Sequence, residues 1–260
     1  RVPHYARTAY TIEREFSRRG YEVILCNTGG DRGETLRYLQ VVNQKQVDGI
    51  VLVGSVFDTI CQGAEMEKLL SGVPVVLANG KLDLPNAYSV TVDDKYGVSL
   101  AVEHLVARGR KNIYYIKDRD TDSAKSKRDG FLEAMRRNGL EFADHVLEAG
   151  ETLASGMETV QALLAQGVVP DGIVCGEDLT AAGALKALLR AGLRVPGQVA
   201  VVGFNNSDYA HLCEPVLTSV DNKPEQVALL CVQLLESSIE RSEAYSSVVL
   251  QPELAQGETS

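Results

Sequence analysis

Residues 169–178 (VPDGIVCGED) decide the fold class of this 260-residue chain, because they combine a turn, an apolar strand and a polar strand end. The Asp-Gly pair is typical of a turn. The β-branched run that follows it is typical of a strand buried on both faces. Residues 46–51 (QVDGIV) repeat the beginning of this pattern in the first half of the chain. The repeat indicates two similar α/β lobes.

Short apolar runs of the same kind recur along the chain and alternate with longer amphipathic stretches, such as 96–107 and 181–189. Continuous apolar strands that alternate with helices are typical of a parallel sheet covered on both faces. We therefore expect a doubly wound α/β protein. The expected strands are Glu22–Cys26, Asp48–Gly54, Val73–Ala78, Asn112–Lys117, Asp171–Cys175 and Val199–Phe204.

Four glycines predict where helices end. Each follows an amphipathic stretch, at the position where the chain leaves a helix in the left-handed conformation that glycine adopts without steric cost. They are Gly20, Gly109, Gly139 and Gly192.

The charge balance argues against direct DNA binding by these residues. There are 26 basic and 35 acidic residues, a net charge of −9, and Lys and Arg form no stripe that could neutralise phosphates. No apolar run approaches the ~18 residues of a membrane-spanning helix, and no apolar leader follows Arg1. We expect a soluble, cytoplasmic protein unless a leader was removed.

The cysteines and histidines predict neither a metal site nor a cofactor. The five cysteines are isolated and mostly lie in apolar surroundings, which is typical of reduced thiols in a cytosolic protein. A zinc site needs paired spacing such as C-x-x-C, and the four histidines are scattered. The cysteines are Cys26, Cys61, Cys175, Cys213 and Cys231.

The sequence also offers little for catalysis. Nucleophile-elbow, phosphate-loop, dinucleotide and zinc-protease motifs are missing. Gly29–Gly33 could cradle a phosphate but lacks the lysine and hydroxyl of a phosphate loop, so a flexible loop is favoured. The pairs Asp93-Asp94 and Glu177-Asp178 could be acid/base carboxylates, but capping of helix N-termini explains them more simply. We expect that the protein is not an enzyme.

Polar residues follow several expected strands, namely Asn79, Glu177-Asp178 and Asn205-Asn206. In open α/β sheets, ligands bind at the carboxyl ends of parallel strands. These residues are therefore candidates for binding a ligand.

Several motifs, taken in order and spacing, resemble the effector-binding region of the LacI/GalR family of bacterial transcriptional regulators. The resemblance covers nearly the whole sequence. It implies two similar doubly wound parallel-sheet lobes with a ligand cleft between them, the periplasmic binding protein-like type I fold. The motifs are 2–6 (VPHYA), 19–23 (RGYEV), 47–50 (VDGI), 92–97 (VDDKYG), 103–109 (EHLVARG), 130–131 (GF), 175–184 (CGEDLTAAGA), 201–206 (VVGFNN) and 215–220 (PVLTSV).

The resemblance also implies the domain boundaries. The N-terminal lobe is expected over residues 1–92 plus 221–250, and the C-terminal lobe over residues 93–220 plus 251–260. The helix-turn-helix and hinge helix of the family, and its first strand, would precede Arg1 and are not found in this sequence. Contacts to DNA are therefore assigned to none of its residues.

The implied function is that of a sensor. A small polar effector, a sugar or related metabolite, binds between the lobes, shifts their relative rotation and changes how a homodimer binds operator DNA. Apolar residues beyond one stripe in 60–70 and 227–239 agree with a dimer, although burial within one chain explains them nearly as well. The alternative is a solute-binding protein of a sugar transporter. The free cysteines and the missing leader favour the regulator.

The ligand positions of the family fall on residues of a different chemistry here. Lysine replaces the usual arginine, Glu177 the usual asparagine, and Asn205 the usual aspartate. Because two added carboxylates need a balancing charge, we predict a ligand with an amino or other donor-rich group. The alternative is that Glu151 faces solvent and the ligand is an ordinary sugar or polyol. The implied ligand residues are His4, Tyr5, Asn79, Ser123, Lys127, Glu151, Glu177 and Asn205.

Overall fold

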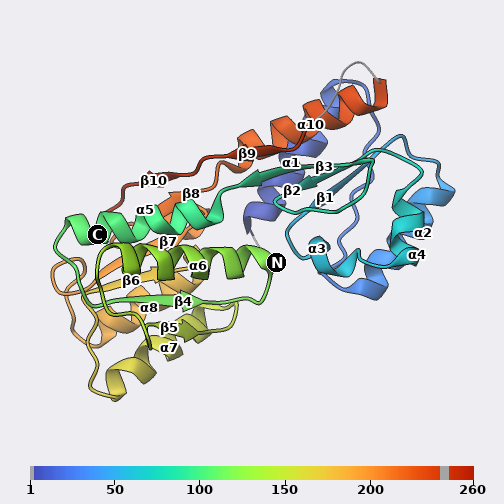
Figure 1. Ribbon diagram of the computed structural model, residues 1–260. Helices are drawn as coiled ribbons and strands as arrows, with labels where there is room; N and C mark the ends of the chain where they lie inside the picture. Colours follow the sequence, from blue (N-terminus) through green and yellow to red (C-terminus); the bar gives the residue numbers. More distant parts are fainter. Residues whose placement is uncertain (1–2, 241–245) are drawn as a thin grey trace. The chain divides into compact units, whose positions relative to one another are not determined.

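The computed structural model describes residues 3–240 and 246–260, and the chain divides into two compact units (Figure 1). Unit 1 comprises Arg1–Val92 and Lys223–Leu250. Unit 2 comprises Asp93–Asn222 and Gln251–Ser260. The chain therefore passes from one unit to the other three times.

Unit 1 is built on a parallel sheet with the strand order β1-β2-β3-β9. Alternate residues of its second strand face opposite layers. Val76 and Ala78 pack with the first and last helices, and Val75 and Leu77 pack with the other three. The strands are β1 (Ile50–Val53), β2 (Val75–Ala78), β3 (Ala87–Val92) and β9 (Val248–Leu250), and the helices are α1 (Pro3–Arg18), α2 (Arg32–Gln44), α3 (Phe57–Ile60), α4 (Ala64–Leu70) and α10 (Pro224–Glu240).

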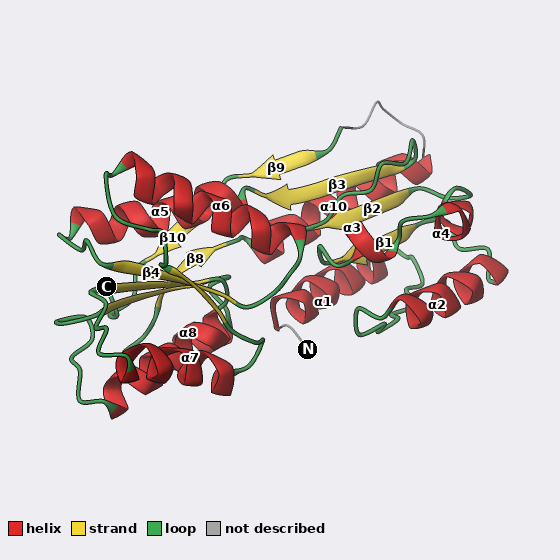
Figure 2. Cartoon of the chain, turned by 60° about the horizontal axis from the view of Figure 1, so that its bottom comes forward, coloured by secondary structure: helices red, strands yellow, loops and turns green. Residues whose placement is uncertain are grey.

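Unit 2 contains a sheet with the order β10-β8-β7-β6-β4-β5, in which only the short β10 is antiparallel. Figure 2 shows α5 and α6 on one side of this sheet and α7 and α8 on the other. The strands are β4 (Ile113–Lys117), β5 (Val146–Glu148), β6 (Gly172–Cys175), β7 (Ala200–Phe204), β8 (Thr218–Asp221) and β10 (Glu253–Ala255). The helices are α5 (Asp94–Ala107), α6 (Asp122–Arg137), α7 (Leu153–Ala165), α8 (Asp178–Arg190) and α9 (Asp208–His211).

The predicted fold class is confirmed: both units are α/β, with parallel strands covered by helices on both faces. Five of the six expected strands form within two residues of their predicted bounds. The two Asp-Gly turns lie at equivalent places, each between a helix and a buried strand. All four predicted helix-ending glycines have positive φ angles, between 64° and 86°.

The strand predicted at Glu22–Cys26 is wrong for the described chain. Residues 22–28 have no regular secondary structure, and Leu25 is 71% exposed. The apolar pattern favours a strand, but a strand also needs a partner for its backbone hydrogen bonds. β1 is the edge of its sheet, and none of the strands in residues 3–240 and 246–260 lies beyond it.

The helical stretch expected over 60–70 is also interrupted. α3 ends at Ile60 and α4 begins at Ala64, with Gly63 at φ 103° between them. The residues of this stretch that are buried, Cys61, Met66 and Leu70, pack within unit 1. None of the helices in the described residues is long and apolar enough to cross a membrane.

Candidate functional site

The carboxyl ends of β4, β6, β7 and β8 meet at one edge of the unit 2 sheet, because these strands run parallel. Polar residues follow each strand there: Asp118 after β4, Glu177 after β6, Asn205 after β7 and Asn222 after β8. α6, which follows β4, adds Lys127 to this group. We call this edge of unit 2 the polar edge.

Lys127 is a buried cation at the polar edge, with 6% of its surface exposed. Its Nζ donates a hydrogen bond to the carbonyl oxygen of Gly176 at 3.0 Å. The same atom lies 3.8 Å from the centre of the Phe204 ring, which is a favourable cation–π distance. One turn earlier on α6, Ser123 donates a 2.6 Å hydrogen bond to Asp94. Both predicted residues of this helix therefore have fixed positions.

A chain of side-chain hydrogen bonds joins three strand ends. Asn222 Nδ2 donates to Asn205 Oδ1 at 2.6 Å, and Asn205 Nδ2 donates to Glu177 Oε2 at 2.5 Å. Asn205 has a φ of 98°, a strained conformation for a residue other than glycine. The strain and the hydrogen bonds together fix the direction of this amide.

Burial raises the pKa of Glu177 to about 8, although the positive charge of Lys127 opposes the shift. Burial also raises the pKa of Asp118, again opposed by Lys127 and then by Arg119. One buried lysine therefore offsets the charge of both carboxylates. Desolvation of the charged form outweighs its attraction in each case.

Asp178 is the best satisfied carboxylate of this region. It is fully buried and accepts hydrogen bonds from the backbone and side chain of Ser207 at 2.7 and 2.8 Å, and from Ser219 at 2.6 Å. Burial nevertheless raises its pKa to about 6. Its oxygen lies 2.2 Å from where a side chain at Gly203 would begin, so only glycine fits there. Asp178 thus ties the ends of β6, β7 and β8 together.

The capping interpretation holds for one acidic pair and fails for the other. Asp93 accepts a hydrogen bond from the backbone of Tyr96 at 2.9 Å and caps α5. Glu177 stands at the N-cap of α8, but its side chain makes no capping hydrogen bond. Its carboxylate turns to Asn205 instead, as expected of a residue that serves a site.

Three predicted residues belong to unit 1. His4 lies in the first turn of α1, and its side chain is outside the described residues. The Tyr5 ring lies against Gly54, the residue that follows β1. Asn79 follows β2 in the left-handed conformation, with φ 56°. Tyr5 and Asn79 therefore both lie at the carboxyl ends of unit 1 strands.

Glu151 lies beyond the end of β5, with 54% of its side chain exposed. Its carboxylate is 3.1 Å from the guanidinium of Arg119, which follows Asp118. The glutamate is thus at the rim of the polar edge, where its exposed carboxylate pairs with the largely buried Arg119.

Sequence reasoning missed Tyr115, Asp118, Arg119 and Asn222. The signal for Asp118 and Arg119 was present, because they come directly after the expected strand Asn112–Lys117. Asn222 lies two residues after the motif 215–220, and neither that motif nor the family positions single it out. Tyr115 lies inside β4, where it looked like an ordinary core residue.

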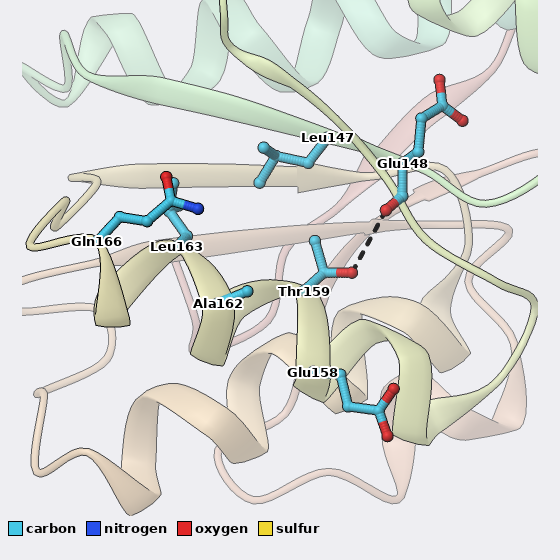
Figure 3. A pocket seen from close by; sticks show the side chains of 7 residues that line it. All are labelled: Leu147, Glu148, Glu158, Thr159, Ala162, Leu163 and Gln166. Atoms are coloured by element: carbon cyan, nitrogen blue, oxygen red, sulfur yellow. Dashed lines mark hydrogen bonds between the residues drawn. The ribbon is translucent and has the colours of Figure 1, made fainter.

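A hollow of about 370 Å³ lies elsewhere on unit 2, between β5 and α7 (Figure 3). Thr159 donates a weak 3.5 Å hydrogen bond to the carbonyl of Glu148 across it. None of the predicted ligand residues lines it, and the glutamates at its rim are exposed. We therefore place the candidate site at the polar edge. The hollow is lined by Leu147, Glu148, Glu158, Thr159, Ala162, Leu163 and Gln166.

Comparison with known proteins identifies the class. Residues 102–260 match the family model of the periplasmic binding protein-like domain. The chain is 32% identical, over 233 residues, to an HTH-type transcriptional regulator of Lachnoclostridium phytofermentans, covering 88% of this chain and 70% of the relative.

Solved structures agree. A LacI transcriptional regulator from a Rhodococcus species is 29% identical, with a TM-score of 0.86 over 100% of this chain and 94% of that one. A CelR–cellobiose complex is 27% identical, with a TM-score of 0.88 over 100% of this chain and 80% of that one. The chain therefore belongs to the LacI/GalR family. It is a ligand-sensing domain of a transcriptional regulator, and the transporter alternative is not supported.

Proposed function

We propose that the polar edge of unit 2 binds a small polar effector, and that this binding is coupled to operator binding. The observation that carries the proposal is the set of buried polar side chains at four strand ends, centred on Lys127, Glu177 and Asn205. A structural core has no need of a buried lysine and strained asparagine at this edge, whereas a ligand site does.

DNA binding is proposed to occur through a helix-turn-helix, the element named in the regulator of L. phytofermentans. Coupling requires only that the effector bind the DNA-competent and DNA-incompetent forms with different affinity. The two units are proposed to act as the two lobes expected from the sequence. The protein is proposed to act in the cytoplasm and to catalyse no reaction.

The effector is proposed to be sugar-like or to carry an amino group. The CelR structure contains cellobiose, which supports a polyhydroxylated ligand. Asn205 offers one acceptor and one donor group, so it suits a hydroxyl that both donates and accepts. Lys127 has further N–H donors on the same side, and the Ser123 hydroxyl, whose proton is donated to Asp94, can accept a hydrogen bond. Tyr5 and Asn79 remain proposed contacts.

The experiment is a thermal-shift screen of the purified chain with sugars, polyols, nucleosides and amino compounds, followed by calorimetric titration of the hits. We expect at least one class to raise the melting temperature, with a dependence on concentration. A hit whose affinity is the same in Glu177→Gln and Asn205→Ala variants would place the effector elsewhere.

We also propose a homodimer, as the family resemblance implies. The apolar residues of α10 do not require one, since Cys231, Val232 and Leu235 are buried within unit 1. Exposed apolar side chains remain on unit 2, including Leu189 at 42% and Leu212 at 80%. Light scattering at tens of micromolar tests this, and a strict monomer would contradict it.

A further inference from the structure

Three buried polar atoms at or under the polar edge have no hydrogen-bond partner within the described residues. They are Tyr115 Oη, Asp118 Oδ2 and Asn222 Oδ1, on residues that are 0%, 7% and 5% exposed. A buried polar atom left unpaired is unfavourable, because it has lost its hydrogen bonds to water and gained none in the protein. Three of them in one region indicate a place where a bound molecule completes the hydrogen bonds.

Two of the three residues, Tyr115 and Asp118, lie beside the turn between β6 and α8. A side chain added at Gly176 would begin 2.9 Å from Asp118 Oδ1 and 3.1 Å from Tyr115 Oη. Asn222 reaches the same turn through Asn205, which donates to Glu177. The residues that carry the unpaired atoms therefore adjoin Gly176 and Asn205, next to residues already assigned to the effector site.

The same region carries more negative than positive charge. Asp178 and Asp94 are stabilised by their own serine donors. Lys127 contributes positive charge, and its Nζ contacts the Gly176 carbonyl and the Phe204 ring. Neither contact involves Asp118, so Asp118 Oδ2 receives no hydrogen bond from Lys127.

Arg119 does not supply that donor either. Its Nε lies 3.8 Å from Asp118 Oδ2, beyond hydrogen-bond distance, and its guanidinium faces Glu151 at 3.1 Å. Arg119 Nε itself has no hydrogen-bond partner among the described residues. The carboxylate of Asp118 thus lacks a compensating cation in contact with it.

We propose that the effector carries a primary ammonium group that binds Asp118 Oδ2 beside Tyr115 Oη, and a hydroxyl that donates to Asn222 Oδ1. An ammonium group has three donors and no acceptor, so it fits a surface of unpaired acceptors and supplies the missing charge. The chemical class is an amino sugar or amino polyol. This inference rests on the proposed function, because it names the ligand class of the same site.

The test compares matched probes on the purified chain by thermal shift and calorimetry. D-glucosamine, D-galactosamine and D-glucamine are each paired with the N-acetylated compound and with the parent sugar or polyol. We expect at least one aminated probe to bind 10-fold or more tightly than both of its neutral counterparts. Asp118→Asn should abolish this preference, and Tyr115→Phe should reduce it.

Asp120→Asn is the matched control, since Asp120 lies in the same loop with 80% of its side chain exposed. It should keep the preference. Neutral probes that bind as tightly as aminated ones would overturn the inference and leave the proposed function intact. Failure of every aminated probe to bind would also overturn it. Binding that is insensitive to both Glu177→Gln and Asn205→Ala would instead contradict the proposed function.

A second measurement needs no ligand. Because Asp118 Oδ2 is buried without a hydrogen-bond donor among the described residues, Asp118→Asn should raise the melting temperature at pH 8. A lower melting temperature in this variant would show that Asp118 stabilises the fold, and would overturn the inference.

Discussion

The two units share an architecture and differ in what they bury. Among the described residues, the buried polar side chains of unit 1 are all hydroxyls: Thr8, Thr11, Thr35, Ser55 and Ser89. Those of unit 2 include charged side chains, among them Lys117, Asp118, Lys127 and Asp178. Two sheets of the same type can thus present very different chemistry at their ends. From this comparison we expect that binding of charged ligand groups, and the dependence of stability on pH, belong to unit 2.

The largest effect is expected from removing the buried cation of unit 2. Lys127→Met should destabilise the chain by about 3–5 kcal/mol at pH 8, because it leaves Asp118 and Glu177 without their balancing charge. The loss should be smaller at pH 4, where the carboxylates take up protons. Urea unfolding at pH 8 and at pH 4 measures the two losses of stability. Lys186→Met, on the exposed face of α8, is the control and should change stability by less than ~0.5 kcal/mol.

The second effect is a dependence of stability on pH that belongs to unit 2. The folded-state pKa of Glu177 is about 8, against an ordinary value of 4.5. Between these values the unfolded chain releases the proton that the folded chain keeps, so stability falls as pH rises, by at most ~1.4 kcal/mol per pH unit. Glu177→Gln should reduce the slope of the unfolding free energy against pH between pH 5 and 8. An unchanged slope would show that Glu177 titrates normally.

A third prediction concerns effector affinity. Once a binding compound is known, Glu177→Gln and Asn205→Ala should each weaken it by about 1–3 kcal/mol, since each leaves a buried partner unpaired. Calorimetric titration measures the change. Glu158→Gln, at the hollow between β5 and α7, should leave affinity unaltered, and an equal loss there would make the unit 2 assignment untenable.

The smallest effect should be the same in both units. Glu151→Gln breaks an ion pair with Arg119 at the rim of the polar edge in unit 2, and Glu225→Gln breaks an exposed one with Arg7 in unit 1. Each substitution should lower the free energy of unfolding by less than ~1 kcal/mol. In 0.5 M salt this difference from the parent chain should become smaller. A much larger cost in unit 2 alone would mean that Glu151 is part of the buried network.

Periodicity and turn residues predicted most of the fold, because both act locally. The Asp-Gly turns and the helix-ending glycines depend on backbone preferences of a few neighbouring residues. Glu22–Cys26 shows the limit of local prediction. Its apolar pattern is that of a strand, but whether a strand forms depends on a neighbouring strand that can pair with its backbone. Family positions led to Lys127, Glu177 and Asn205, which lie at one edge.

The rest of the site could not be predicted, for reasons of three-dimensional contact. Asp118 is unusual only because its oxygen is buried without a donor, and no pattern in the sequence reports a missing donor. Asn222 matters because Asn205, 17 residues earlier in the chain, turns toward it. Glu151, predicted from family position, has an exposed side chain.

The way the chain passes between the units also determines when each can fold. The apolar core of unit 1 joins Ile12 and Phe16 of α1 to Val227 and Cys231 of α10, so it brings together residues more than 200 positions apart. During synthesis at ~5–20 residues per second, the part of the α1 face that packs against α10 has no partner until α10 leaves the ribosome. The first unit to be made is therefore completed after most of the second. A nascent chain halted at residue 222 should bind chaperones through the uncovered face of α1.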